Sequence, residues 1–142
     1  MILGDLDRFK RVNDDHGHDS GDIVLKETAQ RLSSQMRAQD VLCRWGGEEI
    51  LILLPETDLK GALHLAEKLR LSIAGEPMRA GEHLIPQTIS LGVTSCRGRD
   101  AIENAIKRAD EALYKAKDGG RNRTEVIAPP QSEYAVTDRQ GI

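Results

Sequence analysis

Four acidic residues follow apolar or glycine-rich runs at two places in the chain. Asp5 and Asp7 follow the run that starts at the first residue, and Glu48 and Glu49 follow a Gly-Gly pair in "RWGGEEILILL". If the first strand pairs with the strand after the glycines, these acids meet at one edge of a sheet. Hard divalent cations such as Mg²⁺ prefer carboxylate and carbonyl oxygens, while substrate phosphates fill the remaining positions. Asp5 and Glu49 are therefore candidate metal ligands.

The adjacent acids Glu48 and Glu49 are expected to have different roles, because neighbouring residues on a strand point to opposite faces. Paired acids near a turn are more often solvated surface groups. Here, however, the following "ILILL" is uniformly apolar and indicates a buried strand. We therefore expect the two carboxylates to lie at the mouth of a cleft.

Three segments have apolar residues at the spacing of an amphipathic helix: 25–36, 59–73 and 102–116. The residues expected to begin or end these helices are Asp19 or Ser20, Thr57 or Asp58, Gly75 with Pro77, and Gly119 with Gly120. Each helix should pack one face against a sheet.

Strand-forming runs at 41–45 and 48–54 flank Gly46 and Gly47, which predicts a β-hairpin with a primed turn. The alternating, β-branched segment 87–96 predicts another strand, and "RTEVI" predicts a final short one.

This alternation of strands and helices, with one antiparallel hairpin, predicts an α/β (α+β) domain. Its central sheet should be mixed and largely antiparallel, with about five strands covered by helices. The domain should span residues 1–127. Residues 128–142 lack periodicity and contain Pro, Gly and polar residues, which predicts a flexible tail.

The composition of the chain excludes some classes of binding partner. The 142 residues are 39% hydrophobic and 30% charged, as in one globular domain. The aromatic fraction of 3% and net charge of -3 disfavour nucleic acid polymers as partners. Cys43 and Cys96 are far apart without a CxxC motif, so neither zinc nor a disulfide is expected and both should be small buried residues. No apolar run of about 18 residues occurs, so we expect a cytoplasmic segment without membrane contact, although the full-length protein could be membrane-tethered.

The chain resembles the GGDEF-domain family of diguanylate cyclases in four segments that have the family's order and separation. These segments are "DLDRFKRVNDDHGHDSGD", "RWGGEEI", "TISLGV" and "RADEALYKAKDGGRN". The resemblance covers the chain from Asp5 to about Ile127. It implies a fold similar to nucleotidyl cyclase and polymerase palm domains. It also implies condensation of two GTP molecules into cyclic di-GMP with release of pyrophosphate, by a homodimer in which each domain holds one GTP.

The resemblance assigns roles to the acids. Asp5, Glu49 and the backbone carbonyl of Leu6 would hold Mg²⁺ or Mn²⁺. Glu48 would lie beside the ribose 3′-hydroxyl as the catalytic base, which suits an in-line attack on an α-phosphate.

The resemblance also assigns substrate contacts. Asn13 and Asp22 would read guanine, because a carboxylate can accept both N1–H and the exocyclic amine; taken alone, both residues would be helix-capping and loop residues. Lys117 and Arg121 would face the triphosphate, although both could be ordinary charges at a helix C-terminus. The remaining matched positions are Asp7, Phe9 and Lys10, in a turn that offers N–H groups to phosphates, together with Gly46 and Gly47. Phe9 is expected to pack, and neither Arg44 nor His18 is assigned a role.

Arg37 and Asp40 form an RxxD pair five residues before the glycines, where many family members bind a product dimer. The alternative is an ion pair on a helix surface. Because Arg suits bidentate binding of phosphate and guanine edges, we expect product inhibition through this pair.

The sequence departs from the family pattern at two places. Ile50 replaces the usual Phe, which should cause modest repacking, and the helix that precedes the first strand in the family is absent. Either the chain is a fragment or the domain has an exposed edge. An upstream sensor or receiver domain is expected.

The alternative function is a catalytically inactive module that binds GTP or cyclic di-GMP. Five intact residues argue against it, since a module without catalysis does not need all of them: Asp5, Glu48, Glu49, Asn13 and Asp22. Asp22 disfavours an adenine-containing product.

Overall fold

The computed structural model describes residues 1–98 and 100–130. Its elements, in chain order, are β1 (Ile2–Leu6), α1 (Phe9–His16), α2 (His18–Ser34), β2 (Val41–Arg44), β3 (Glu49–Leu53), α3 (Leu59–Ala74), β4 (Met78–Ala80), β5 (His83–Ile85), β6 (Ile89–Val93), α4 (Ile102–Asp118) and β7 (Thr124–Val126). No helix in these residues is both long and apolar enough to cross a membrane.

The main sheet has five strands in the order β2-β3-β1-β6-β7. All neighbours are antiparallel except β6 and β7, which are parallel. The predicted mixed, largely antiparallel sheet is therefore confirmed. β1 lies between β3 and β6, so the expected exposed edge does not fall on the first strand.

Gly4 allows close packing in the central strand. A Cβ at this position would lie 2.7 Å from Leu91 Cδ2 and 3.1 Å from Ile50 Cγ1. Ile50, which stands where the family usually has Phe, is half-buried and packs against the larger core. Its side chain thus fills space that a larger residue at position 4 would take.

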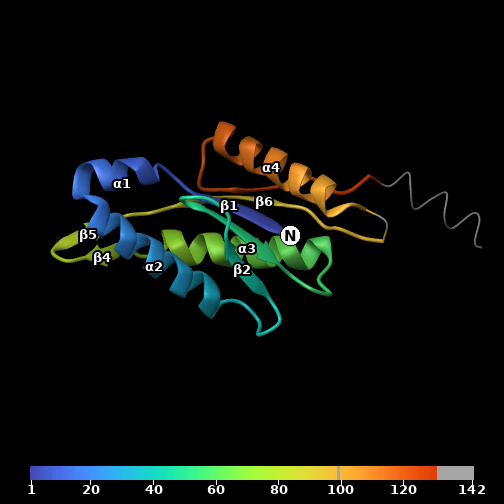
Figure 1. The fold of residues 1–142 in the computed structure, drawn as a ribbon, viewed down its shortest axis with the longest axis horizontal. Helices are drawn as coiled ribbons and strands as arrows, with labels where there is room; N and C mark the ends of the chain where they lie inside the picture. Colours follow the sequence, from blue (N-terminus) through green and yellow to red (C-terminus); the bar gives the residue numbers. More distant parts are fainter. Residues whose placement is uncertain (99, 131–142) are drawn as a thin grey trace, which may run out of the picture.

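Successive residues of β1 and β3 contribute to two cores on opposite faces of the sheet. Ile2 and Ile52 belong to the larger core, which α2 and α3 complete, and Leu3 and Leu51 belong to the smaller core with α4. Figure 1 shows α4 on one side of the strands and α2 and α3 on the other. Because strand residues alternate in direction, Asp5 shares the α4 face with Leu3.

The three predicted helices are confirmed, except at the ends of α2, which stops at Ser34, before the predicted Met36, and starts differently. Asp58 caps α3 by accepting a hydrogen bond from the Gly61 N–H (2.7 Å), and the C-cap of α4 is Gly119. The N-cap of α2 is Gly17 (φ 87°), and no side chain caps this helix. The prediction of an Asp19 or Ser20 cap was wrong, because α1 ends at His16 and the chain turns at once.

The predicted hairpin of β2 and β3 is present, but its turn is different. Arg44 pairs with Ile50, and the Trp45 N–H donates to the Glu49 carbonyl (2.8 Å). Neither Gly46 nor Gly47 has the positive φ that a primed turn requires. The primed turn was a wrong prediction, because Glu48 joins the two glycines in a longer connection.

Other expectations fail where long-range packing decides the outcome. The hairpin of β4 and β5 was not predicted from its short, mixed sequence. Cys43 is half-buried and Cys96 is exposed, so the prediction of two buried cysteines was wrong. Of the expected tail, residues 128–130 form neither helix nor strand, and the remainder lies outside the described residues.

Arg31 of α2 ties the C-terminal end of α3 to the rest of the fold. Its guanidinium donates to the carbonyls of Ser72 (3.2 Å), Ile73 (3.2 Å), Glu76 (2.8 Å) and Pro77 (3.3 Å). The last carbonyls of a helix have no partner within the helix, so this side chain satisfies groups that otherwise need water.

We expect Arg31→Ala to lower the free energy of unfolding by about 2 kcal/mol, because several charge-assisted hydrogen bonds are lost together. Arg31→Lys should recover only part of this, since an ammonium cannot span four carbonyls. Urea denaturation followed by circular dichroism measures the effect, with the exposed neighbour variant Gln30→Ala as control. Equal stability of Arg31→Ala and Gln30→Ala would contradict the assigned role.

Candidate functional site

Asp5 and Glu49 lie directly opposite each other on β1 and β3. Residues paired in this way share a face of the sheet, and here that face is covered by α4. The ammonium of Lys117 on α4 forms an ion pair with Asp5, whose side chain is 11% exposed. The structure therefore brings the two expected metal ligands and one expected phosphate contact together.

The carboxyl group of Glu49 lies in a negatively charged environment. Burial raises its pKa, and the negative charge of Asp5 raises it further; Lys117 opposes this change, while Asp110 and Glu48 add to it. The local acids thus outweigh the one nearby cation. A site with this excess of buried negative charge favours the binding of a cation.

The donor set suits a hard divalent cation. Two carboxylates come from β1 and β3, and the main chain of Leu6 lies against the hairpin turn, where its N–H donates to the Glu48 carbonyl (3.2 Å). No three His, Cys, Asp or Glu side chains form a metal-binding cluster within residues 1–98 and 100–130. Two carboxylates plus a carbonyl leave positions for substrate phosphates, as Mg²⁺ commonly requires.

Glu48 faces a different space, a cavity of about 430 Å³ between α1, α2 and the hairpin turn. The cavity is lined by Phe9, Lys10, Asn13, His18, Asp22, Leu25, Arg44, Gly47 and Glu48. Within the described part of the chain, the side chains of Asn13, Asp22 and Glu48 have no hydrogen-bond partner. They are therefore available to a ligand. Glu49 does not line this cavity, but Glu48 and Glu49 both line a neighbouring cavity of about 320 Å³. Glu48 lies in the connection before β3, so the predicted alternation along a strand does not apply to this pair.

Gly21 places Asn13 in this cavity. A Cβ at position 21 would lie 1.9 Å from Asn13 Oδ1 and 3.3 Å from Phe9 Cζ. Only a glycine in α2 therefore allows the Asn13 amide to lie where it does. Phe9 is 7% exposed and belongs to the larger core, as its expected packing role requires. Sequence reasoning missed Gly21, and the only signal was a glycine within a helix.

Arg44 holds the glycine turn. Its guanidinium donates to the carbonyls of Gly46 (3.3 Å) and Gly47 (3.1 and 2.8 Å). A Cβ on Gly46 would approach Glu49 Oε2 to 3.2 Å, whereas Gly47 has open space around it. Both glycines therefore lie beside the acids, and Gly47 lines the cavity.

Asp7 is bound entirely by the protein. Its carboxylate accepts hydrogen bonds from the hydroxyls of Thr88 (2.7 Å) and Ser90 (2.6 Å) and from the Asn122 N–H (3.0 Å). Its own N–H donates to the Thr88 carbonyl (3.0 Å). Asp7 thus joins the end of β1 to β6 and to the loop after α4, and its N–H is already used.

The expected phosphate-binding turn is reduced to residues 8–10. Arg8 has a left-handed conformation (φ 55°) and precedes the first turn of α1, where no side chain caps the helix. Helix starts with uncapped N–H groups favour anions. Arg121 also has a left-handed conformation (φ 65°), in the loop just after α4, and its side chain has no partner among the described residues.

Arg37 and Asp40 lie in the loop between α2 and β2, so they are not on a helix surface. The Arg37 guanidinium binds Asp40 Oδ1 (3.0 Å), the Pro55 carbonyl (3.0 Å) and Thr57 Oγ1 (2.6 Å). Burial acts to raise the pKa of the Asp40 carboxyl, but the hydrogen bonds from Arg37 outweigh it and keep the pKa below its ordinary value.

A separate cavity of about 280 Å³ adjoins this pair, and its lining includes Arg37, Asp40, Thr57, His64 and Lys68. Lys68 and His64 come from α3, and sequence reasoning missed both. The only signal was polar residues on the outer face of an amphipathic helix. The basic groups make this cavity suitable for an anionic ligand.

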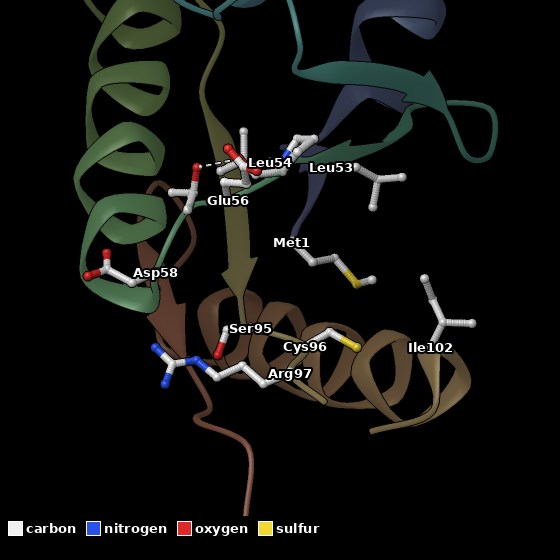
Figure 2. A pocket seen from close by; sticks show the side chains of 11 residues that line it. Met1, Leu53, Leu54, Glu56, Asp58, Ser95, Cys96, Arg97 and Ile102 are labelled. Carbon is white, nitrogen blue, oxygen red and sulfur yellow. Dashed lines mark hydrogen bonds between the residues drawn. The ribbon is translucent and has the colours of Figure 1, made fainter. Parts of the chain in front are cut away.

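A third cavity, of about 460 Å³, lies at the opposite end of the sheet and contains none of the expected site residues. Figure 2 shows Met1, Cys96 and Ile102 on one side of it, with Glu56 and Asp58 from the β3–α3 connection on the other. Its position at the start of β1 separates it from the acids at the end of that strand.

Comparisons with known proteins identify the family of this chain. The family model "Diguanylate cyclase, GGDEF domain" matches residues 1–123. The response regulator PleD of Caulobacter vibrioides is 47% identical over 124 residues, which are 85% of this chain and 27% of PleD. The chain therefore spans about a quarter of that relative's length.

Solved structures of GGDEF domains have a similar fold. The active GGEEF domain of a diguanylate cyclase from Vibrio cholerae has a TM-score of 0.83 and 38% identity, over 91% of this chain and 82% of that one. The GGDEF domain of DgcB from Caulobacter crescentus, in complex with c-di-GMP, has a TM-score of 0.83 and 27% identity, over 88% and 75%. Because the family model matches most of its residues, this chain belongs to the GGDEF domain family of diguanylate cyclases.

Proposed function

We propose that the protein is a diguanylate cyclase that condenses two GTP molecules into cyclic di-GMP and releases pyrophosphate. The observation that carries this proposal is the separation of Glu48 from the pair of Asp5 and Glu49. One carboxylate faces a cavity that contains Asn13 and Asp22, and the other two face α4 and Lys117. A candidate base beside a nucleotide-sized cavity, next to a candidate metal site, suits phosphoryl transfer from a nucleotide.

Asp5, Glu49 and the Leu6 carbonyl would hold Mg²⁺ or Mn²⁺. When bound, such a metal neutralises charge on the phosphates and polarises them for attack. Lys117, Arg121 and the N–H groups at the start of α1 would bind the triphosphate. These groups orient the α-phosphate without taking part in proton transfer.

Glu48 would accept the proton of the attacking ribose 3′-hydroxyl. Each attack forms one P–O bond at the α-phosphate and breaks the bond to the leaving pyrophosphate. In the cavity, the Asp22 carboxylate can accept two N–H groups from guanine, whereas adenine would leave it without these donors. Asn13 donates and accepts beside it, so GTP is favoured over ATP.

Ring closure needs two nucleotides in opposite orientations. The described residues form one cavity that contains Asn13, Asp22 and Glu48, which provides for one nucleotide per chain. We therefore infer that catalysis requires a homodimer with two facing sites. An upstream sensor or receiver domain would control how often the two sites meet.

The basic cavity at Arg37 would bind the cyclic dinucleotide product and provide feedback inhibition. Asp40 and Thr57 hold the Arg37 guanidinium in a fixed orientation. This reduces the entropy that is lost when an anion binds. A catalytically inactive module that only binds GTP or cyclic di-GMP remains the second candidate. Intact Asp5, Glu48 and Glu49 favour the enzyme over this module.

The central test compares two acid variants. Full-length protein with GTP and Mg²⁺ should form cyclic di-GMP, detected by chromatography. Glu49→Ala should reduce both turnover and Mn²⁺ affinity by at least about a hundredfold. Glu48→Gln should reduce turnover similarly. It should leave Mn²⁺ affinity within about twofold, because Glu48 lines the cavity with Asn13 and Asp22 and is not one of the proposed metal ligands. A wild-type dimer that binds GTP but releases no pyrophosphate would support the inactive module instead.

Gly21→Ala should weaken GTP binding by about tenfold, because its Cβ would displace the Asn13 amide, one of the expected guanine contacts. Alanine has a higher helix propensity than glycine. The loss of GTP binding is therefore not expected to come from a less stable α2. Isothermal titration with the Asn13→Ala background as control tests the coupling. If Gly21→Ala weakens binding equally in both backgrounds, it does not act through Asn13.

Arg37→Ala should weaken product inhibition by at least about tenfold, since a bidentate contact to phosphate or guanine is lost. The inhibition constant for added cyclic di-GMP measures this. The exposed neighbour variant Gln39→Ala, in the same loop, should keep wild-type inhibition. An Arg37→Ala enzyme that is still inhibited like the wild type would rule out this cavity as the feedback site.

A further inference from the structure

The ion pair between Lys117 and Asp5 places an ammonium group on a carboxylate that the proposed metal also needs. Lys117 lies at the C-terminal end of α4, 112 residues after Asp5 in sequence. Burial and the charge of Asp5 raise the pKa of Glu49, and the positive charge of Lys117 opposes this rise, so the ammonium acts on both carboxylates. One side chain therefore provides the counter-charge for the pair.

The charges explain why a counter-ion is needed in this position. Asp5 is almost fully buried, and Glu49 is half-buried directly opposite it. Two close carboxylates repel each other, and an unpaired buried charge is costly. The Lys117 ammonium relieves this repulsion when no other cation is present. A divalent cation on the same oxygens would in turn repel the ammonium.

The geometry allows Lys117 to leave. Its side chain is 34% exposed, in contrast to 11% for that of Asp5, and a lysine has a flexible four-carbon stem that ends in a mobile point charge. The start of α1 and Arg121 form the rest of the expected triphosphate site. An ammonium that leaves Asp5 can therefore move towards the phosphates without a change in the backbone.

We propose that Lys117 is an internal counter-ion of the metal site: it must leave Asp5 when a divalent cation binds, and the released ammonium then binds the nucleotide triphosphate. The identity of the metal and the nucleotide rests on the proposed function. The consequence is that metal and nucleotide bind cooperatively through one side chain. Either ligand then reduces the cost of binding the other.

The first test measures Mn²⁺ affinity without nucleotide, by electron paramagnetic resonance of free Mn²⁺. Lys117→Met should bind Mn²⁺ on the order of tenfold more tightly than the wild type, because no ammonium must be displaced. Lys115→Met removes the same charge from an exposed position on the same helix and should change the affinity by less than about twofold. Lys117→Gln, which keeps a polar side chain, should behave like Lys117→Met.

Unchanged or weaker Mn²⁺ binding by both Lys117 variants would overturn the proposal. Equal gains in the Lys117 and Lys115 variants would also overturn it, since the effect would then be a general change of charge. Thermal unfolding of each variant, followed by circular dichroism, confirms that the compared proteins are folded.

The second test repeats the titration with a GTP analogue that has a non-hydrolysable bridge between its α- and β-phosphates. The analogue should tighten Mn²⁺ binding in the wild type by a factor about tenfold larger than in Lys117→Met. If the analogue tightens Mn²⁺ binding by the same factor in both proteins, Lys117 does not couple the binding of metal and nucleotide. A wild type that binds Mn²⁺ but makes no cyclic dinucleotide would refute only the proposed function. An active enzyme whose Lys117 variants gain no Mn²⁺ affinity would refute only this inference.

Discussion

The antiparallel register of β1 and β3 is the constraint on which the rest of the site depends. It places Asp5 opposite Glu49, and a slip of one residue would replace Glu49 by Glu48 or Ile50. The register is held by apolar residues that alternate between two cores on opposite faces of the sheet. A slip would turn each set to the opposite face, away from the residues it packs against, so hydrophobic packing determines which carboxylates meet.

The start of β3 separates Glu48, in the connection, from Glu49, the first residue of the strand. Asp5 and Glu49 face α4, where Lys117 offsets their charge, and Glu48 faces the cavity between α1 and α2. The surrounding protein keeps both sides in place through polar contacts. Arg44 holds the glycine turn, and Asp7 joins the end of β1 to β6 and to the loop after α4. The site therefore depends on these hydrogen bonds as well as on the acids.

Much of the fold could be predicted from the sequence, because helix periodicity and capping are local properties. The amphipathic spacing located α3 and α4, and Asp58 and Gly119 marked their ends. The hairpin of β2 and β3 was predicted as well, but its turn conformation was not. Glu48 belongs to the connection between Arg44 and Glu49, and both of these residues lie in strands whose positions depend on the whole sheet. The short hairpin of β4 and β5 has too few residues for a pattern.

The sequence by itself determined which residue types are present, the order of the elements and the family resemblance that singled out the acids. Only the tertiary structure decided that Gly21 makes room for Asn13, that Asp7 is saturated by protein groups and that Cys96 is exposed. It also decided that Lys117 reaches Asp5 across 112 residues of chain. The physical reason is that periodicity and capping act between near neighbours. Contacts between distant residues depend on how the helices pack against the sheet.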